Sequence, residues 1–201
     1  MGLSYLRFIE RHLTMRKIVP LLLLLVVPFA FHAQDLKSQI KSFKNSRRFK
    51  VVYDKFDDTT LVTVGPFYLD ADLMEPDNNF QLAAGFGFNG SGQPKDVGDF
   101  NLVFIANGDR DWKFLENRTL KMIVDGERMS FGEADRSSKI GKNWLGEVRL
   151  KETLFVSVPK NVFVKLSQAK IIEMRLGRKE VKLKDEHTQA FRDLITLATP
   201  Q

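Results

Sequence analysis

The densest group of side chains that could do chemistry is an acidic stretch in the first half of the chain. Its carboxylates are Asp70, Asp72, Glu75 and Asp77. Oxygen atoms supplied by a loop are the ligands that Ca²⁺ prefers. The spacing departs from the EF-hand pattern, because Met74 stands where Asn or Asp belongs and the following glycine is absent. The stretch is a weak calcium-site candidate, set against an ordinary acidic surface loop.

Histidine and cysteine are too scarce for most catalytic or metal sites. The chain has 3 histidines and no cysteine, and His12 and His32 fall in the N-terminal leader discussed below. A Ser-His-Asp triad would need His187, and no Gly-x-Ser-x-Gly elbow accompanies it. A zinc site needs three or four His, Cys or carboxylate ligands. We therefore expect His187 to be a surface residue at a helix start, and we assign no catalytic residue and no cofactor.

Paired carboxylates leave one enzymatic alternative open. Glycoside hydrolysis uses two carboxyl groups across a cleft, and the sequence offers Asp109 with Asp111, or Glu147 with Glu152. Spacing alone places neither pair across a cleft. A hydrolase acting on glycans or on the cell envelope is therefore an alternative to a binding protein.

A glycine-rich stretch, Gly85–Gly90, matches the dinucleotide fingerprint G-x-G-x-x-G. That fingerprint works where a strand turns into a helix whose N-terminus holds pyrophosphate. Here the stretch lies between two strand-like runs and continues into Ser-Gly-Gln-Pro, which favours a loop. We therefore interpret it as a glycine-rich strand end.

Three aromatic residues in or near loops are candidates for binding a partner, namely Trp112, Phe114 and Trp144. Exposed aromatic rings stack on sugars or anchor protein partners. The same rings can instead cap a β core, and the sequence does not separate the two.

The basic charge of the chain is concentrated near its N-terminus. The formal net charge is +6, yet the residues after Lys50 hold 21 basic and 23 acidic side chains. This near-neutral remainder argues against nucleic-acid binding, which needs a positive field. Between the N-terminal leader and this remainder, the basic residues are Lys37, Lys41, Lys44, Arg47, Arg48 and Lys50. They predict a basic tether or a short amphipathic helix at 34–48, and a possible contact with an anionic membrane surface is a further alternative.

The elements that must position these residues are mainly strands. Residues 49–53, 60–69, 80–88, 100–106 and 146–158 are rich in β-branched and aromatic residues or alternate in polarity. Asp125-Gly126 predicts a tight hairpin within 120–131, and Gly177-Arg178 predicts another within 171–183. Helical spacing follows Pro159 and recurs from Asp185, the expected N-cap, to Ala198. Together these patterns predict an antiparallel β-sandwich of about eight strands, with a short helix and a C-terminal amphipathic helix.

The N-terminus has the pattern of an export signal. Arg16-Lys17 precedes an uncharged run of 14 residues at 18–31, which is shorter than the roughly 20 residues of a membrane span. We predict a signal peptide at 1–33 cleaved near Ala33, in which 1–14 is either an upstream false start before Met15 or an extended n-region. A single β-rich domain at 49–201 would then be periplasmic or secreted.

The layout of residues 49–198 resembles small exported bacterial β-rich proteins of uncharacterised function. The resemblance is carried by the turn at 53–59, the hairpin at 124–127 and the strand end at 173–177. It implies one compact domain behind a signal peptide and supplies no activity. The leading hypothesis is a non-catalytic binding domain that holds a protein or glycan of the cell envelope through its sheet faces or loop aromatics.

Overall fold

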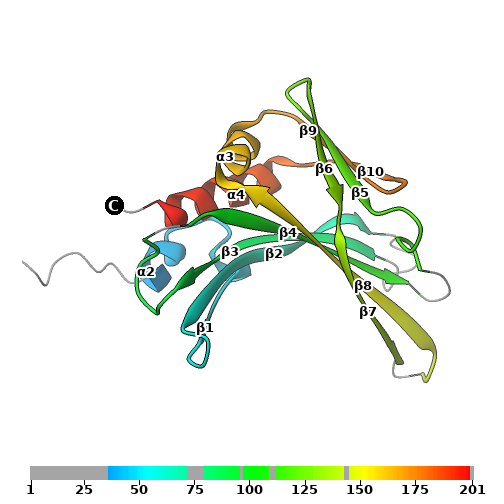
Figure 1. Ribbon diagram of the computed structural model, residues 1–201, viewed down its shortest axis with the longest axis horizontal. Coiled ribbons are helices and arrows are strands. Elements are labelled where there is room, and N and C mark those ends of the chain that lie inside the picture. The colour runs from blue at the N-terminus through cyan, green and yellow to red at the C-terminus, as the bar shows by residue number, and fades with distance from the viewer. Residues whose placement is uncertain (1–35, 72–78, 96, 109–111, 143–144, 200–201) are drawn as a thin grey trace, which may run out of the picture. The chain divides into compact units, whose positions relative to one another are not determined.

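The computed structural model describes residues 36–71, 79–95, 97–108, 112–142 and 145–199. Within them the chain forms ten strands, arranged in two antiparallel sheets, and three α-helices (Figure 1). The predicted mainly β, two-sheet class with a short helix and a C-terminal helix is confirmed. From Leu36 onward the chain forms one compact unit. No helix among these residues is long and apolar enough to cross a membrane.

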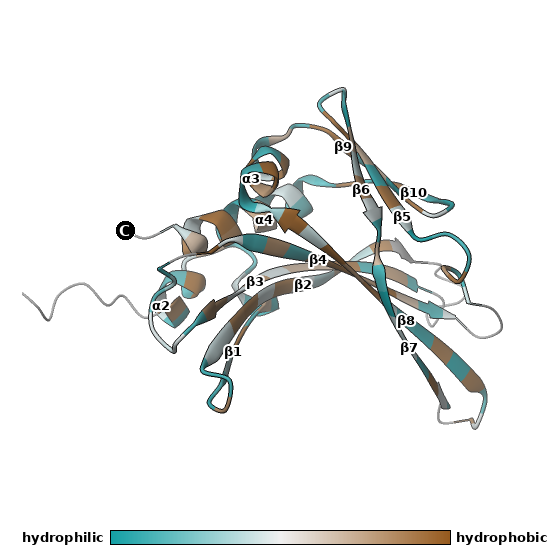
Figure 2. Cartoon of the chain, viewed as in Figure 1, coloured by the Kyte–Doolittle hydropathy of each residue, from teal (hydrophilic) through white to brown (hydrophobic). Residues whose placement is uncertain are grey.

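The larger sheet has six strands in the order β1-β2-β3-β4-β8-β7. Its strands are β1 (Phe49–Asp54), β2 (Thr59–Ala71), β3 (Asn79–Asn89), β4 (Asp99–Gly108), β8 (Val148–Pro159) and β7 (Asp135–Lys142). Along β8, hydrophilic and hydrophobic residues alternate, so that one side faces the core (Figure 2). The edge strand β7 was not predicted, because nearly all its residues are exposed and its sequence carries no alternation.

The smaller sheet has four strands in the order β10-β9-β5-β6. Its strands are β10 (Lys179–Lys182), β9 (Ile172–Leu176), β5 (Thr119–Val124) and β6 (Glu127–Glu133). The predicted Asp125-Gly126 hairpin is confirmed, with φ of 48° and 90° at its two central residues. The Asp125 carboxylate also accepts hydrogen bonds from the backbone N–H groups of Lys170 and Ile171, at 3.1 and 2.8 Å. These bonds tie the hairpin to the start of β9.

Two helices close one face of the larger sheet, beside the smaller sheet (Figure 1). They are α3 (Lys160–Gln168) and α4 (Asp185–Ala198). Phe163 of α3 stacks on Phe100 of β4, with ring centroids 4.1 Å apart, and also packs on Phe191 of α4, at 5.1 Å. A continuous aromatic contact therefore joins the sheet to both helices, as expected for the centre of a core.

Strand β2 contains an irregularity at Pro66, a residue type that within a strand indicates either an edge strand or a bulge. Its register with β3 shifts between Val64 and Phe67, on either side of this proline. Because β2 lies between β1 and β3, the bulge alternative is confirmed and the edge-strand alternative is wrong. Gly85 and Gly87 lie within β3 and Gly90 follows that strand, so the fingerprint-like stretch is a strand end as expected.

The basic N-terminal segment belongs to the packed unit. Helix α2 (Leu36–Lys41) buries Leu36 and Ile40 in the core, and a 3₁₀ turn, η2 (Ser46–Arg48), leads into β1. Arg48 lies over the ring of Phe67, 4.5 Å from its centroid. Of the two predicted alternatives for 34–48, the short helix is therefore observed from Leu36 to Lys41.

Candidate functional site

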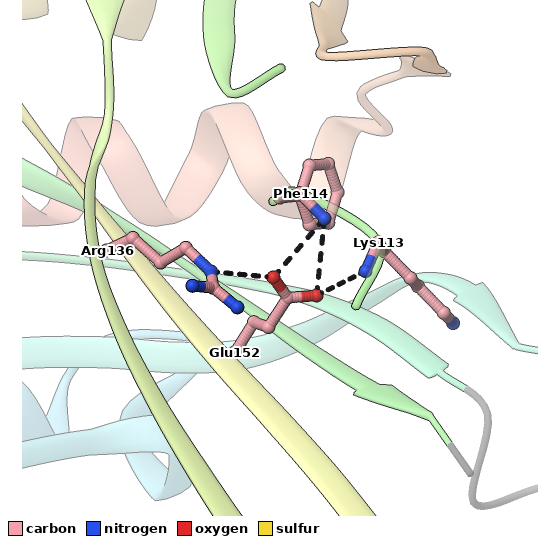
Figure 3. Close-up of polar contacts among 4 residues, drawn as sticks. All are labelled: Lys113, Phe114, Arg136 and Glu152. Carbon is pink, nitrogen blue, oxygen red and sulfur yellow. Dashed lines mark hydrogen bonds and ion pairs between the residues drawn. The ribbon is translucent and has the colours of Figure 1, made fainter. Parts of the chain in front are cut away.

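Glu152 is the most strongly engaged acid among the described residues, and it joins a loop to the larger sheet. Its side chain is only 3% exposed and forms an ion pair with Arg136 Nε of β7 at 2.8 Å (Figure 3). Its Oε2 accepts a hydrogen bond from the backbone N–H of Lys113 at 2.6 Å, and both oxygens accept from that of Phe114, at 3.2 and 3.3 Å. Both oxygens of this carboxylate already accept hydrogen bonds from the protein. Its role is therefore structural, and it presents no free lone pair to solvent.

The carboxylate pairs proposed for hydrolysis are therefore not supported by Glu152. Glu147, just before β8, is exposed and forms an ion pair with Arg149 at 3.3 Å. Asp109 and Asp111 lie outside the described residues. No group of three or more His, Cys, Asp or Glu side chains that could hold a metal occurs in the part of the chain that is described. Of the calcium candidates, Asp72, Glu75 and Asp77 lie outside this part, as does the side chain of Asp70.

For Phe114 the structure shows the core alternative and not the exposed binding alternative. Phe114 is 1% exposed and packs against Phe80 at 5.6 Å, because its backbone N–H is held by Glu152 and its ring fills the core. Trp112 is half-buried, and the guanidinium carbon of Arg136 lies over its ring, 4.9 Å from the ring centroid. Trp144 lies outside the described residues. Within the described residues, the loop aromatics Trp112 and Phe114 therefore do not form an exposed binding surface.

The prediction that His187 is a surface residue is wrong. It is 1% exposed, and its ring meets the ring of Phe67 edge-on at 5.2 Å. Lys184, not Asp185, is the N-cap of α4, and its backbone N–H donates to His187 Nδ1 at 2.8 Å. Burial lowers the pKa of His187 below its ordinary value. His187 caps a helix inside the core and is not a catalytic candidate.

The charged side chains of the basic segment are exposed, whereas its apolar side is buried. Lys37, Lys41, Lys44, Arg47 and Lys50 are exposed, whereas Leu36 and Ile40 are buried. Arg48 is partly buried and its guanidinium is 3.9 Å from the Glu186 carboxylate. An amphipathic helix binds a membrane by inserting its apolar side. In α2 that side is already occupied by the core, so only the charges can contact a surface.

The candidate site that the geometry provides is a groove on the outer face of the smaller sheet. It has a volume of about 890 Å³ and is lined by three consecutive residues from each strand, namely 121–123, 128–130, 173–175 and 180–182. The middle residues Met122 and Met174 are buried in the core, so the flanking residues of each triplet face the groove. A groove of this size falls within the range of ligand sites.

Six of the twelve residues that line this groove are charged. Its members with formal charge are Lys121, Arg128, Arg175 and Lys182, against Glu173 and Glu180. On the β9–β10 half the charges are matched, since Arg175 pairs with Glu180 at 3.4 Å and Glu173 lies opposite Lys182 in the register.

On the β5–β6 half the charges are not matched. Lys121 lies opposite Arg175 and Ser130, and Arg128 lies opposite the exposed Ile123. Among the described residues neither Lys121 nor Arg128 has an acidic partner. The groove is therefore net cationic, with the excess charge next to the apolar side chain of Ile123, whose other cross-strand neighbour is Glu173.

No family model, no curated protein and no solved structure matches this chain. The groove is therefore the feature of this chain that bears on its function. The sequence pattern did not single the groove out. Alternation along 120–124 and 172–176 places Lys121 and Arg175 outward, but it does not show that these strands are neighbours.

Proposed function

We propose that this protein is an exported binding domain that holds an extended anionic partner of the cell envelope in the groove of the smaller sheet. One observation carries the proposal: Lys121 and Arg128 lie in an open groove as neighbours of Ile123, one along the strand and one across it, without acidic partners in the described chain. Cations arranged around an apolar contact suit a ligand with anionic groups on an apolar or sugar backbone.

The cross-strand pairing supports a ligand-binding role for this face. Like charges directly opposite each other destabilise a sheet, and Lys121 lies opposite Arg175. An anion bound between them would relieve that repulsion.

The experiment compares Lys121→Thr with Lys151→Thr, using dextran sulfate as an anionic probe and neutral dextran as control. Lys151 of β8 also lies opposite a like charge, Lys139, but on the larger sheet and outside the groove. Both substitutions relieve a cross-strand repulsion and add a β-branched residue, so each should raise the free energy of unfolding by about 0.5 kcal/mol. Only Lys121→Thr should weaken dextran sulfate binding, by about fivefold in a titration at low salt.

Arg128→Gln provides a second, independent arm of the same titration. It should weaken dextran sulfate binding by a similar factor, and binding should fall steeply as salt is added. Equal weakening by Lys151→Thr would mean that general charge, not the groove, binds the probe. Absence of dextran sulfate binding by the unaltered protein at low salt would disprove the proposal.

A further inference from the structure

A second pocket continues the groove at one end of the smaller sheet. It has a volume of about 410 Å³ and shares Lys121, Arg175 and Glu180 with the groove. Its own lining residues are Asn117, Thr119, Gly177 and Arg178, from the loop before β5 and the turn after β9. The pocket is therefore formed by two segments that are about sixty residues apart in the sequence.

The walls of this end pocket are held together by close backbone packing. Gly177 has a φ of 59°, and a Cβ atom there would lie 2.5 Å from the carbonyl oxygen of Asn117. Its N–H donates a hydrogen bond to the carbonyl of Thr119 at 3.1 Å. Only glycine fits this approach without displacing the loop, so the turn carrying Arg178 is fixed against the start of β5.

The chemistry of the end pocket is that of an anion site. Three cations from three positions line it, namely Lys121 on β5, Arg175 on β9 and Arg178 in the turn. Its one acid, Glu180, is already paired with Arg175. Within the described residues Lys121 and Arg178 have no acidic partner, and Thr119 supplies a hydroxyl on the same outward side of β5 as Lys121.

Resting on the proposed function, we infer that the end pocket binds a tetrahedral oxyanion group, phosphate or sulfate, carried by the partner held in the groove. A tetrahedral oxyanion accepts hydrogen bonds in several directions out of one plane. Donors that converge from a strand, its neighbour and a turn suit that demand better than they suit a planar carboxylate, which one arginine can satisfy.

The experiment titrates the full protein with inorganic phosphate, sulfate and acetate at constant ionic strength, following backbone amide resonances by NMR. Phosphate and sulfate should shift the amides of Thr119 and Gly177, and acetate should bind at least fivefold more weakly. Arg178→Gln, which alters the end pocket alone, should weaken phosphate binding at least fivefold. Lys151→Thr, which removes a cation outside both the groove and the end pocket, should leave phosphate binding unchanged.

Several outcomes would overturn the inference. Acetate binding as tightly as phosphate would do so, as would an absence of shifts at Thr119 and Gly177, or equal weakening by both variants. The proposed function fails separately. If phosphate does not bind while dextran sulfate binding still depends on Lys121 and Arg128, the groove proposal stands and the oxyanion pocket does not.

Discussion

At the scale of single residues, the buried polar groups of this protein fix the positions of loops and helix ends. The Glu152 carboxylate accepts hydrogen bonds from one guanidinium and from two backbone N–H groups. These bonds anchor residues 113–114 to β8. A buried carboxylate in this arrangement is costly to remove, because its partners lose their acceptor while staying out of water. Its role is to hold the loop that precedes the end pocket.

Glu152→Gln should destabilise the fold by about 2 kcal/mol, since the amide removes the charge that Arg136 faces and can accept fewer hydrogen bonds. Urea unfolding followed by circular dichroism measures the change. Glu147→Gln is the matched control, because its ion pair with Arg149 is exposed on the glutamate side, and it should change stability by less than about 0.5 kcal/mol. Equal effects of the two substitutions would contradict the anchoring role.

His187 gives the fold a pH dependence of known sign. Burial lowers its pKa from the ordinary value of 6.5, so the folded protein binds this proton less tightly than the unfolded chain does. The stability that neutral His187 contributes is therefore complete above about pH 6.5 and is lost as the pH falls below that value.

His187→Asn keeps a hydrogen-bond acceptor near the Lys184 N–H but does not titrate. The free energy of unfolding of the unaltered protein should drop more between pH 7.5 and pH 5 than that of the variant. Urea midpoints at the two pH values measure this difference. Because the other acids, including the buried Asp193, are present in both proteins, their contributions cancel in the comparison. Parallel pH profiles would rule out His187 as the source.

At the scale of elements, helix α2 shows how a segment with a tether-like composition becomes part of a domain. It is only six residues long, and so short a helix is not stable in isolation. Leu36 and Ile40, four residues apart, both lie on the side that the core buries. Tertiary packing therefore stabilises the helix, and its lysines face outward.

Ile40→Ala should lower the free energy of unfolding by about 2 to 3 kcal/mol, since it removes buried methyl groups and leaves a cavity. Lys41→Ala, at the next position and exposed, should change it by less than about 0.5 kcal/mol. Chemical denaturation of the two variants measures both values. Were Ile40→Ala as mild as Lys41→Ala, the segment would be a tether after all.

At the scale of the whole molecule, one core serves two sheets. The chain passes from β6 of the smaller sheet to β7 of the larger one through the single buried residue Ala134. Because the inner faces of both sheets are buried in this core, a ligand can bind only to the outer faces and edges of the sheets. The groove of the smaller sheet is one such outer face, and it carries excess positive charge.

The sequence predicted elements better than it predicted sites. Strands that alternate in polarity, and turns such as Asp125-Gly126, are determined by neighbouring residues and were predicted correctly. Strand β7 was missed because its pairing with β8 (Asp135 with Phe155, for example) rests on backbone hydrogen bonds, which leave no pattern in exposed side chains. His187 was misplaced and Phe114 was left between two alternatives, because burial depends on residues far away in the sequence.

The amino-acid sequence by itself determined the β class, the hairpins and the helix spacing, because period and turn chemistry act over a few residues. Only the tertiary structure decided which strands lie side by side. That choice brings Lys121, Arg128 and Arg175 from three strands onto one face and sets Arg178 beside Thr119. The physical reason is that cross-strand neighbours are fixed by packing of the shared core, to which outward-facing charges contribute almost nothing.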